Sequence, residues 1–402
     1  MHPRQIALTA IAITVTTFAQ IEPVRAQQVP EHPVGALQAT FPEGFGAVRG
    51  VRELPDGRVL VSDGLGKAVV VWDLNAATAD TIGGIGGGPA EYQLPDGLFA
   101  LPDGKTLLVD LGNGRLTELG PDLSFGETTP IAQAPPGDPP TQGSPGRGGQ
   151  MIRMSFVLPR GADETGAVYF QDMGMGMADS AGVKRFDPRT GEVEEVGKVK
   201  GPELNRVESG GASERNVQIQ QVPLAPQDAW AVAWDGRVAI ARAAEYRLEW
   251  MLPDGGVVRG EPVDYRPLPI RTADKEQWVE DLAANGLGVQ MEIDNGQRRT
   301  SFSRGGRFGD ANLDSYAWPE TKPAFRSSGV RVSWAGDAWV ERHVPAGDAR
   351  LFDVFGADGN LKASVRLPED RQLVAFGDGT LYLMRVDEFD FNWLERYELP
   401  SL

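Results

Sequence analysis

The sequence predicts an all-β protein, a six-bladed β-propeller made of four-stranded antiparallel blades, and three observations support this prediction. A motif of a glycine turn followed by a short strand occurs six times in the 402 residues. After most copies comes a second strand and a second turn, as in AVVVWDLNAATAD after the first. Glycine (50 residues) and proline (30 residues) are frequent, which is typical of chains with many turns. Short meanders of this kind must stack on neighbours, and six of them around a channel form a propeller.

The repeated motif places an apolar residue four positions after its glycine in every copy. The copies are PDGRVLVSD (55–63), PDGKTLLVD (102–110), ETGAVYFQD (164–172), AWDGRVAIAR (233–242), WAGDAWVER (334–342) and GDGTLYLMR (377–385). A tight hairpin needs a residue with positive φ, which glycine adopts without steric cost. We therefore expect six hairpins at the anchor glycines, which are Gly57, Gly104, Gly166, Gly236, Gly336 and Gly379.

The first 26 residues are typical of a cleaved secretory signal. They contain a basic start at Arg4, an apolar run over 6–19 and a small-residue exit at Ala26. That run is too short to span a bilayer core of ~30 Å. We expect cleavage near Ala26 and an exported mature chain, periplasmic or secreted. Residues 27–402 are then one propeller domain without a membrane span.

Two long insertions interrupt the repeat. Residues 134–150, APPGDPPTQGSPGRGGQ, have a composition that opposes packing and predict a flexible loop rich in proline and glycine. Residues 271–317, between blades 4 and 5, open with TADKEQWVEDLA, which predicts a short helix. Thr272 can cap this helix and Asp274 lies near its positive end. We expect the Arg-rich residues 295–310 to form a loop and the whole insertion to fold over one face as a lid.

Composition excludes several kinds of chemistry. The chain has no cysteine, which excludes disulfides and thiolate sites, and its net charge of −17 opposes nucleic-acid binding. It has three histidines, of which His343 alone lies in a blade, too few for zinc held by several histidines. No Gly-x-Ser-x-Gly motif supports a serine hydrolase. We interpret His343 as a solvated loop residue.

The segments 83–116 (GGIGGGPAEYQLPDGLFALPDGKTLLVDLGNGRL), 351–368 (LFDVFGADGNLKASVRLP) and 381–399 (LYLMRVDEFDFNWLERYEL) resemble those of bacterial six-bladed β-propeller proteins related to NHL repeats. This resemblance covers most of the mature chain and implies the architecture. It leaves the activity open, because the group includes binding modules, lyases and lactone hydrolases.

Two short motifs allow more than one interpretation. The glycine-rich stretch 83–92 could cradle a phosphate, but Pro89 lacks a donor, Glu91 repels anions and no helix follows. We expect a connector between blades. Met173, Met175 and Met177 could hold Cu(I), although methionine also fills gaps between blades, and no His or Cys lies nearby.

A charged residue follows each anchor glycine by six positions. These residues are Asp63, Asp110, Asp172, Arg242, Arg342 and Arg385. Six residues of strand rise ~20 Å, so all six should lie at the end of the ring opposite the glycine turns. One interpretation is pairing within each blade, such as Asp63 with Lys67 or Asp110 with Arg115. The other is a charged mouth in which arginine binds carboxylate or phosphate and aspartate binds amines or a cation.

We expect an exported, non-catalytic propeller that binds a small-molecule or protein ligand through this charged face. We also expect it to be a monomer and to need no cofactor, although the acidic chain would allow a bound Ca²⁺. The alternative is a Ca²⁺-dependent lactonase or lyase of the gluconolactonase-like kind, with Asp63, Asp110 or Asp172 helping to hold the ion. In either case GALQATF (35–41) is a candidate strand to complete the last blade beside the C-terminus.

Overall fold

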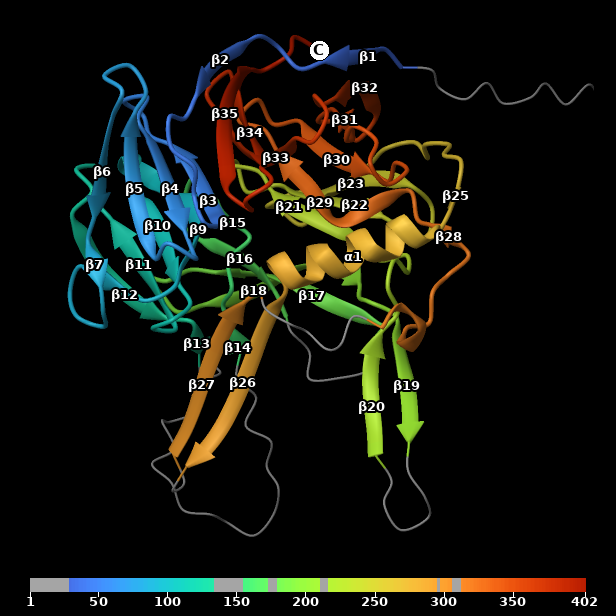
Figure 1. The fold of residues 1–402 in the computed structure, drawn as a ribbon, viewed down its shortest axis with the longest axis horizontal. Coiled ribbons are helices and arrows are strands. Elements are labelled where there is room, and N and C mark those ends of the chain that lie inside the picture. The colour runs from blue at the N-terminus through green and yellow to red at the C-terminus, as the bar shows by residue number, and fades with distance from the viewer. Residues whose placement is uncertain (1–28, 134–154, 173–178, 210–215, 295–296, 306–311) are drawn as a thin grey trace, which may run out of the picture.

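The computed structural model describes residues 29–133, 155–172, 179–209, 216–294, 297–305 and 312–402. Within these residues, six sheets with four antiparallel strands each follow one another around a ring (Figure 1). The predicted six-bladed propeller is therefore confirmed. The predicted signal peptide, the proline-rich insertion 134–150 and the methionine motif lie outside the described residues.

The strands of a blade are hydrogen-bonded in order from the channel outward. Blade 1 contains β3 (Val48–Glu53), β4 (Val59–Asp63), β5 (Ala68–Asp73) and β6 (Thr78–Ile82). Blade 2 contains β9 (Pro95–Ala100), β10 (Thr106–Asp110), β11 (Arg115–Leu119) and β12 (Phe125–Pro130). Blade 3 contains β15 (Gly161–Ala162), β16 (Val168–Gln171), β17 (Ser180–Phe186) and β18 (Val193–Lys200). Blade 4 contains β21 (Ala229–Val232), β22 (Val238–Arg242), β23 (Arg247–Met251) and β24 (Val257–Arg259). Blade 5 contains β29 (Phe325–Val332), β30 (Ala338–Arg342), β31 (Leu351–Phe355) and β32 (Leu361–Arg366). Blade 6 contains β33 (Gln372–Gly377), β34 (Thr380–Val386), β35 (Asn392–Glu398) and β2 (Leu37–Thr40).

The six anchor glycines form the turns between the first and second strands of the blades. All six have positive φ, between 63° at Gly379 and 85° at Gly166. The side chains four residues later are fully buried; they are Val61, Leu108, Phe170, Ile240, Val340 and Leu383. The repeat therefore sets both the turn and the core of each blade, as the sequence predicts.

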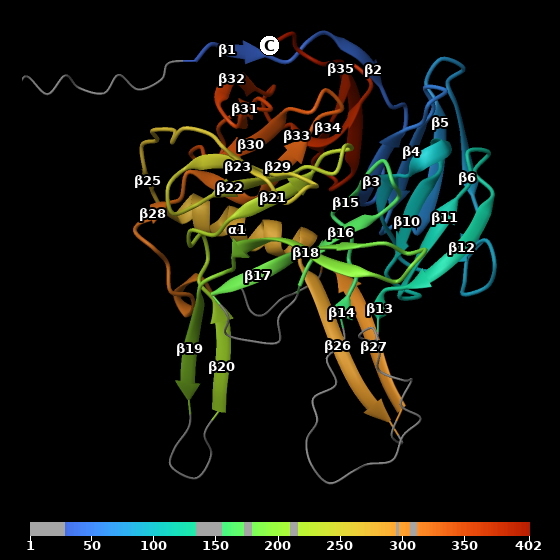
Figure 2. The same cartoon turned by 180° about the vertical axis from the view of Figure 1, so that it is seen from behind.

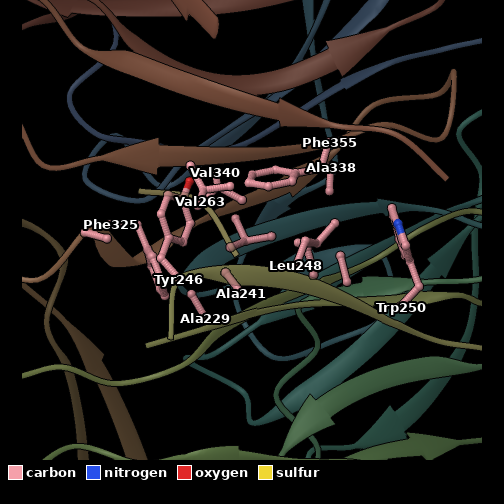
Figure 3. Packing of buried hydrophobic residues seen from close by; sticks show 14 of the residues in the cluster. Ala229, Ala241, Tyr246, Leu248, Trp250, Val263, Phe325, Ala338, Val340 and Phe355 are labelled. Atoms are coloured by element: carbon pink, nitrogen blue, oxygen red, sulfur yellow. The ribbon is translucent and has the colours of Figure 1, made fainter. Parts of the chain in front are cut away.

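Neighbouring blades pack through large side chains on their facing surfaces. Figure 3 shows this packing between blades 4 and 5, where Tyr246, Leu248 and Trp250 face Val340 and Phe355. Ring contacts extend it, since Tyr246 and Phe355 lie 5.9 Å apart between ring centroids. Burial of this apolar area between sheets is the main stabilising term of such a ring.

The N-terminal segment closes the ring. Strand β2 pairs antiparallel with β35 as the outermost strand of blade 6, so the predicted closure by GALQATF is confirmed. Strand β1 (Glu31–Pro33) adds to blade 5 as a fifth strand, parallel to β32. Both segments, blue in Figure 1, lie beside the red C-terminal strands.

The remaining elements lie in connections between blades. They are β7 (Gly84–Ile85), β8 (Glu91–Tyr92), β13 (Ala132–Gln133), β14 (Ser155–Phe156), β19 (Leu204–Ser209), β20 (Asn216–Gln221), β25 (Leu268–Pro269), α1 (Thr272–Asn285), β26 (Leu287–Asp294), β27 (Gln297–Arg304), β28 (Thr321–Lys322) and the 3-10 turns Pro102–Gly104 and Leu313–Ser315. The paired strands β19–β20 and β26–β27 project from the ring in both views (Figures 1 and 2). In the part of the chain that is described, no helix is long and apolar enough to cross a membrane.

The insertion 271–317 is confirmed as partly helical, with two corrections. The N-cap position of α1 is Arg271, and Thr272 is the first helical residue. The Asp274 carboxylate accepts the Arg271 backbone N–H at 2.8 Å, which satisfies a free donor of the first turn. The expectation of a loop over 295–310 is wrong for Gln297–Arg304, which pairs with β26 because the antiparallel ladder satisfies its backbone groups.

Candidate ligand-binding site

The six predicted charged residues lie where the second strand of a blade turns into the third. Asp63 is paired with Val48, Asp110 with Pro95 and Arg342 with Phe325, the first residue of the innermost strand in each case. They therefore share one end of the ring, opposite the glycine turns. We call this the charged end.

Two of the carboxylates at the charged end hold loops together. Asp63 accepts four backbone N–H groups at 2.7–3.1 Å, those of Gly46, Ala47, Leu65 and Gly66. Asp110 is fully buried and binds the N–H groups of Gln93 and Leu94 and the side chain of Asn113. Each aspartate thus ties the entry of its own blade to the following turn.

The other four residues at the charged end have partners within their own blades. Asp172 pairs with Lys184 at 3.1 Å, and Arg242 binds Glu249 at 2.8 Å and Asp228 at 2.9 Å. Arg342 lies 3.6 Å from Asp353, and Arg385 lies 3.8 Å from Glu395. Asp110 and Arg115, 3.5 Å apart, form the predicted pair, whereas Asp63 binds backbone groups instead of Lys67. These contacts favour pairing within blades over a shared mouth.

Helix α1 covers the charged end, as Figure 1 shows. At its C-terminus, Arg49 of blade 1 donates to the Ala284 carbonyl at 3.0 Å, and Arg304 donates to the Asn285 carbonyl at 3.1 Å. Arg304 also binds Asp96 of blade 2 at 2.7 Å. Cations suit these free carbonyls and the negative end of the helix dipole.

The first half of α1 is held on the opposite side of the ring. Asp274 forms a buried ion pair with Lys322 and accepts the Ala346 N–H at 3.1 Å. In the second half of the helix, Asp281 still pairs with Arg326 of blade 5. Because blade 5 lies opposite blade 2 in the ring, the 14-residue helix, ~21 Å long, crosses the channel axis. The predicted lid is present only in part, because α1 covers the predicted binding mouth whereas β26 and β27 of the same insertion project from the ring.

The central channel contains a cavity of about 220 Å³ toward its other end, lined by the innermost strands of all six blades. The lining residues lie in the half of each strand next to the glycine turns. Four aromatic side chains contribute to its wall: Phe99, Trp234, Trp334 and Phe376.

Three arginines line this cavity, one from every second blade. Arg52 donates to the Thr106 hydroxyl, and the guanidinium of Arg160 lies 5.3 Å from the ring centre of Trp230. Arg331 donates to the Leu373 carbonyl at 3.1 Å. Among the described residues, none of the three arginines contacts a carboxylate.

Burial lowers the pKa of all three arginines. It lowers the pKa of Arg52 to about 10, and it also lowers the pKa of Arg331. Arg160 is exposed to solvent, although protein atoms surround it on several sides. Burial by these atoms is the larger cause that lowers its pKa, and repulsion from Arg304 is the second. Arg52 and Arg331 thus carry positive charge in an enclosed space, where charge is costly, while Glu341 attracts the Arg331 charge and Arg160 keeps access to solvent.

The lining carboxylate, Glu53, is already engaged. It accepts hydrogen bonds from the Tyr382 and Thr380 hydroxyls and from the Asp378 backbone N–H. These three groups belong to blade 6, so Glu53 joins blades 1 and 6. Its charge is therefore used in that interface, and Glu53 forms no ion pair with the three arginines.

A second cavity, of about 300 Å³, lies between α1 and blades 5 and 6. Its arginines are Arg326, Arg342, Arg350 and Arg371. Each has an acidic partner: Glu341 for Arg326 and Arg350, Asp353 for Arg342 and Glu395 for Arg371. This cavity is polar, but its charges are matched, so it is the weaker candidate for an anionic ligand.

Two other predicted features have clear outcomes. The glycine-rich stretch 83–92 is a connector, as expected, and Glu91 itself accepts the Gly88 N–H at 2.6 Å where a phosphate would lie. His343 is half-buried, and burial, with repulsion from Arg326 and Lys322, lowers its pKa to about 3. The interpretation of His343 as a solvated residue is wrong. No cluster of three or more His, Asp or Glu able to hold a metal occurs among the described residues.

No protein-family model and no curated protein matches the sequence, so the NHL-repeat resemblance stays a prediction. Similar solved structures include a Bacteroides fragilis protein described as exported, with 11% identity over 92% of this chain and 98% of that chain and a TM-score of 0.48. Virginiamycin B lyase from Staphylococcus aureus has 9% identity over 91% and 99%, with a TM-score of 0.42. Gluconolactonase from Xanthomonas campestris has 11% identity over 94% and 99%, with a TM-score of 0.41. At these values the likenesses carry no argument about activity.

The channel arginines were not among the residues that the sequence predicts. Their signal is positional, since Arg52 and Arg331 precede an anchor glycine by five residues and Arg160 by six. From sequence alone, an arginine in a short strand is interpreted as a solvent-exposed side chain, because the sequence does not show which strand lines the channel. Alignment of the six repeats over the strand that precedes each anchor glycine would have revealed these arginines.

Proposed function

We propose that the protein is an exported, non-catalytic binding protein that holds a small anionic ligand in its central channel. The observation that supports this most strongly is the set of three guanidinium groups, Arg52, Arg160 and Arg331, that line one cavity and form no ion pair with a carboxylate of the described residues. The predicted signal at residues 1–26 supports export. We propose a monomer, since the ring is closed by its own chain.

The physical reason is the cost of unmatched charge. A buried cation without a counter-ion is unfavourable, and a carboxylate or phosphate would replace the missing partner with charge-assisted hydrogen bonds. The whole chain carries a net charge of −17, so positive charge gathered on the axis is a local feature and not a consequence of composition. It attracts an anion into a protein whose surface otherwise repels one.

The six charged residues predicted from the sequence have a smaller part in this proposal than the sequence analysis gave them. Asp63 and Asp110 bind backbone groups, and α1 covers their end of the ring. Arg342 lines the second cavity, where an anion would compete with Asp353. We therefore place the ligand in the channel and regard the charged end as the structural support of the blades.

Binding of simple anions tests this function. Isothermal titration with inorganic phosphate, citrate and benzoate should detect a single site that accepts at least one of them. Arg160→Gln and Arg331→Gln should each weaken that binding by about tenfold or more, the usual value of a charge-assisted hydrogen bond. Arg189→Gln is the matched control, because Arg189 pairs with Asp187 on the surface, outside the cavity. Absence of binding by all three anions, or equal binding by all variants, would contradict the proposal.

A further inference from the structure

The aromatic wall of the channel cavity suggests which anion fits. Trp234 and Trp334 both line the cavity, and their ring centroids lie 5.4 Å apart with a tilt of 52°. They follow the innermost strands of blades 4 and 5, two residues before the glycine turns. Their rings therefore form one platform at the open end of the channel.

Trp334 is the more exposed of the two rings of this platform, so it offers more surface to a ligand. Its side chain is 46% exposed, and its indole N–H donates to the Phe376 carbonyl at 3.1 Å. That hydrogen bond fixes the ring while one of its surfaces stays in contact with water. A tryptophan ring that is held in place and left exposed offers a face on which a ligand ring can stack.

The arginines and the platform line the same cavity. We propose, on the basis of the function proposed above, that the ligand is a small aromatic acid whose ring stacks on Trp334 and whose carboxylate binds Arg160 or Arg331. The ring extends the existing Trp234–Trp334 contact, and the carboxylate supplies the missing counter-ion. The cavity of about 220 Å³ lies below the ~300–1,000 Å³ of most ligand pockets, which favours a single ring.

Three probes of similar size separate the two parts of this inference. Benzoate carries a ring and a charge, cyclohexanecarboxylate carries the charge without aromaticity, and benzamide carries the ring without the charge. Isothermal titration should give benzoate about three- to tenfold tighter binding than cyclohexanecarboxylate, the range for an aromatic pair. Benzamide should bind at least about tenfold more weakly than benzoate. Glucuronate tests a sugar acid in the same titration and should bind more weakly than benzoate.

Variants at Trp334 complete the test. Trp334→Leu should remove the preference for benzoate over cyclohexanecarboxylate, and Trp334→Phe should restore most of it. Phe389→Leu is the matched control, because Phe389 is 72% exposed in the turn after β34, at the charged end. Equal binding of the two carboxylates by the wild type, or tighter binding of glucuronate, would overturn the aromatic inference and leave an anion site. Binding of no anion would overturn the proposed function itself.

Discussion

The backbone N–H of Phe41 donates to the carbonyl oxygen of Leu394 at 2.9 Å, which joins the first blade-forming segment of the chain to the last. The Phe41 side chain is fully buried, with its ring 5.8 Å from that of Trp72 in blade 1 and 6.4 Å from that of Tyr382 in blade 6. Ring closure therefore depends on a core contact as well as on strand pairing.

Removal of this closing segment should destabilise the whole ring. A chain that lacks residues 27–41 loses β2 and Phe41, and we expect a free energy of unfolding lower by at least the ~3–5 kcal/mol of a buried Phe→Ala change. A chain that lacks 27–34 loses the β1 pairing and the Glu31–Arg366 ion pair but keeps β2 and Phe41, so it should lose less. Urea unfolding followed by circular dichroism measures both. Equal stability of the 27–41 deletion and the full mature chain would contradict this closure.

Asp63 should matter for stability far more than Asp172. Asp63→Ala leaves four loop N–H groups without their acceptor, and we expect a loss of about 3 kcal/mol. Asp63→Asn retains one acceptor oxygen and should cost less. Asp172→Ala removes a partly exposed ion pair and should cost less than ~1 kcal/mol. If instead both alanine variants unfold at the same urea concentration, Asp63 does not hold its loop.

His343 should make the protein less stable in mild acid. Its pKa is about 3 in the folded protein and near 6.5 when unfolded, so the unfolded chain binds the extra proton between these values. Stability therefore falls as the pH decreases from about 6.5 toward 3. In His343→Gln the fall from pH 7.5 to pH 4.5 should be smaller than in the wild type. Urea unfolding at the two pH values measures this difference, and identical falls would contradict it.

Calcium tests the alternative of a lactonase or lyase. We expect the midpoint of thermal unfolding to be unchanged by EDTA and by added Ca²⁺, because the oxygens of Asp63 and Asp110 already accept protein N–H groups. An ion bound to the folded protein alone would raise the midpoint in proportion to its affinity. A rise with Ca²⁺ that is lost in Asp172→Asn would favour the enzyme.

The architecture could be predicted because each blade repeats its own local signals. The anchor glycines require positive φ, and the strand after each places a buried residue at a fixed position, so six copies define six blades. The closing strand and the helix also had local signals, in GALQATF and in TADKEQWVEDLA.

The site was harder to predict because it depends on contacts between distant segments. Asp63 was expected at the correct end of the ring, but its partners Gly46 and Ala47 lie 17 and 16 residues away, before the β3–β4 hairpin. The position of α1 depends on Arg49 and Arg304, which no helical pattern identifies. Arg160 becomes a channel residue only when the ring encloses it.

A crystal structure of the protein with 4-bromobenzoate tests the central claim most directly, because anomalous scattering locates the bromine atom. We predict bromine density in the channel cavity beside Trp334, with the carboxylate within hydrogen-bonding distance of Arg160 or Arg331. Density in the cavity beside Arg342 instead, or an empty channel in crystals saturated with the compound, would contradict the assignment of the channel as the ligand site.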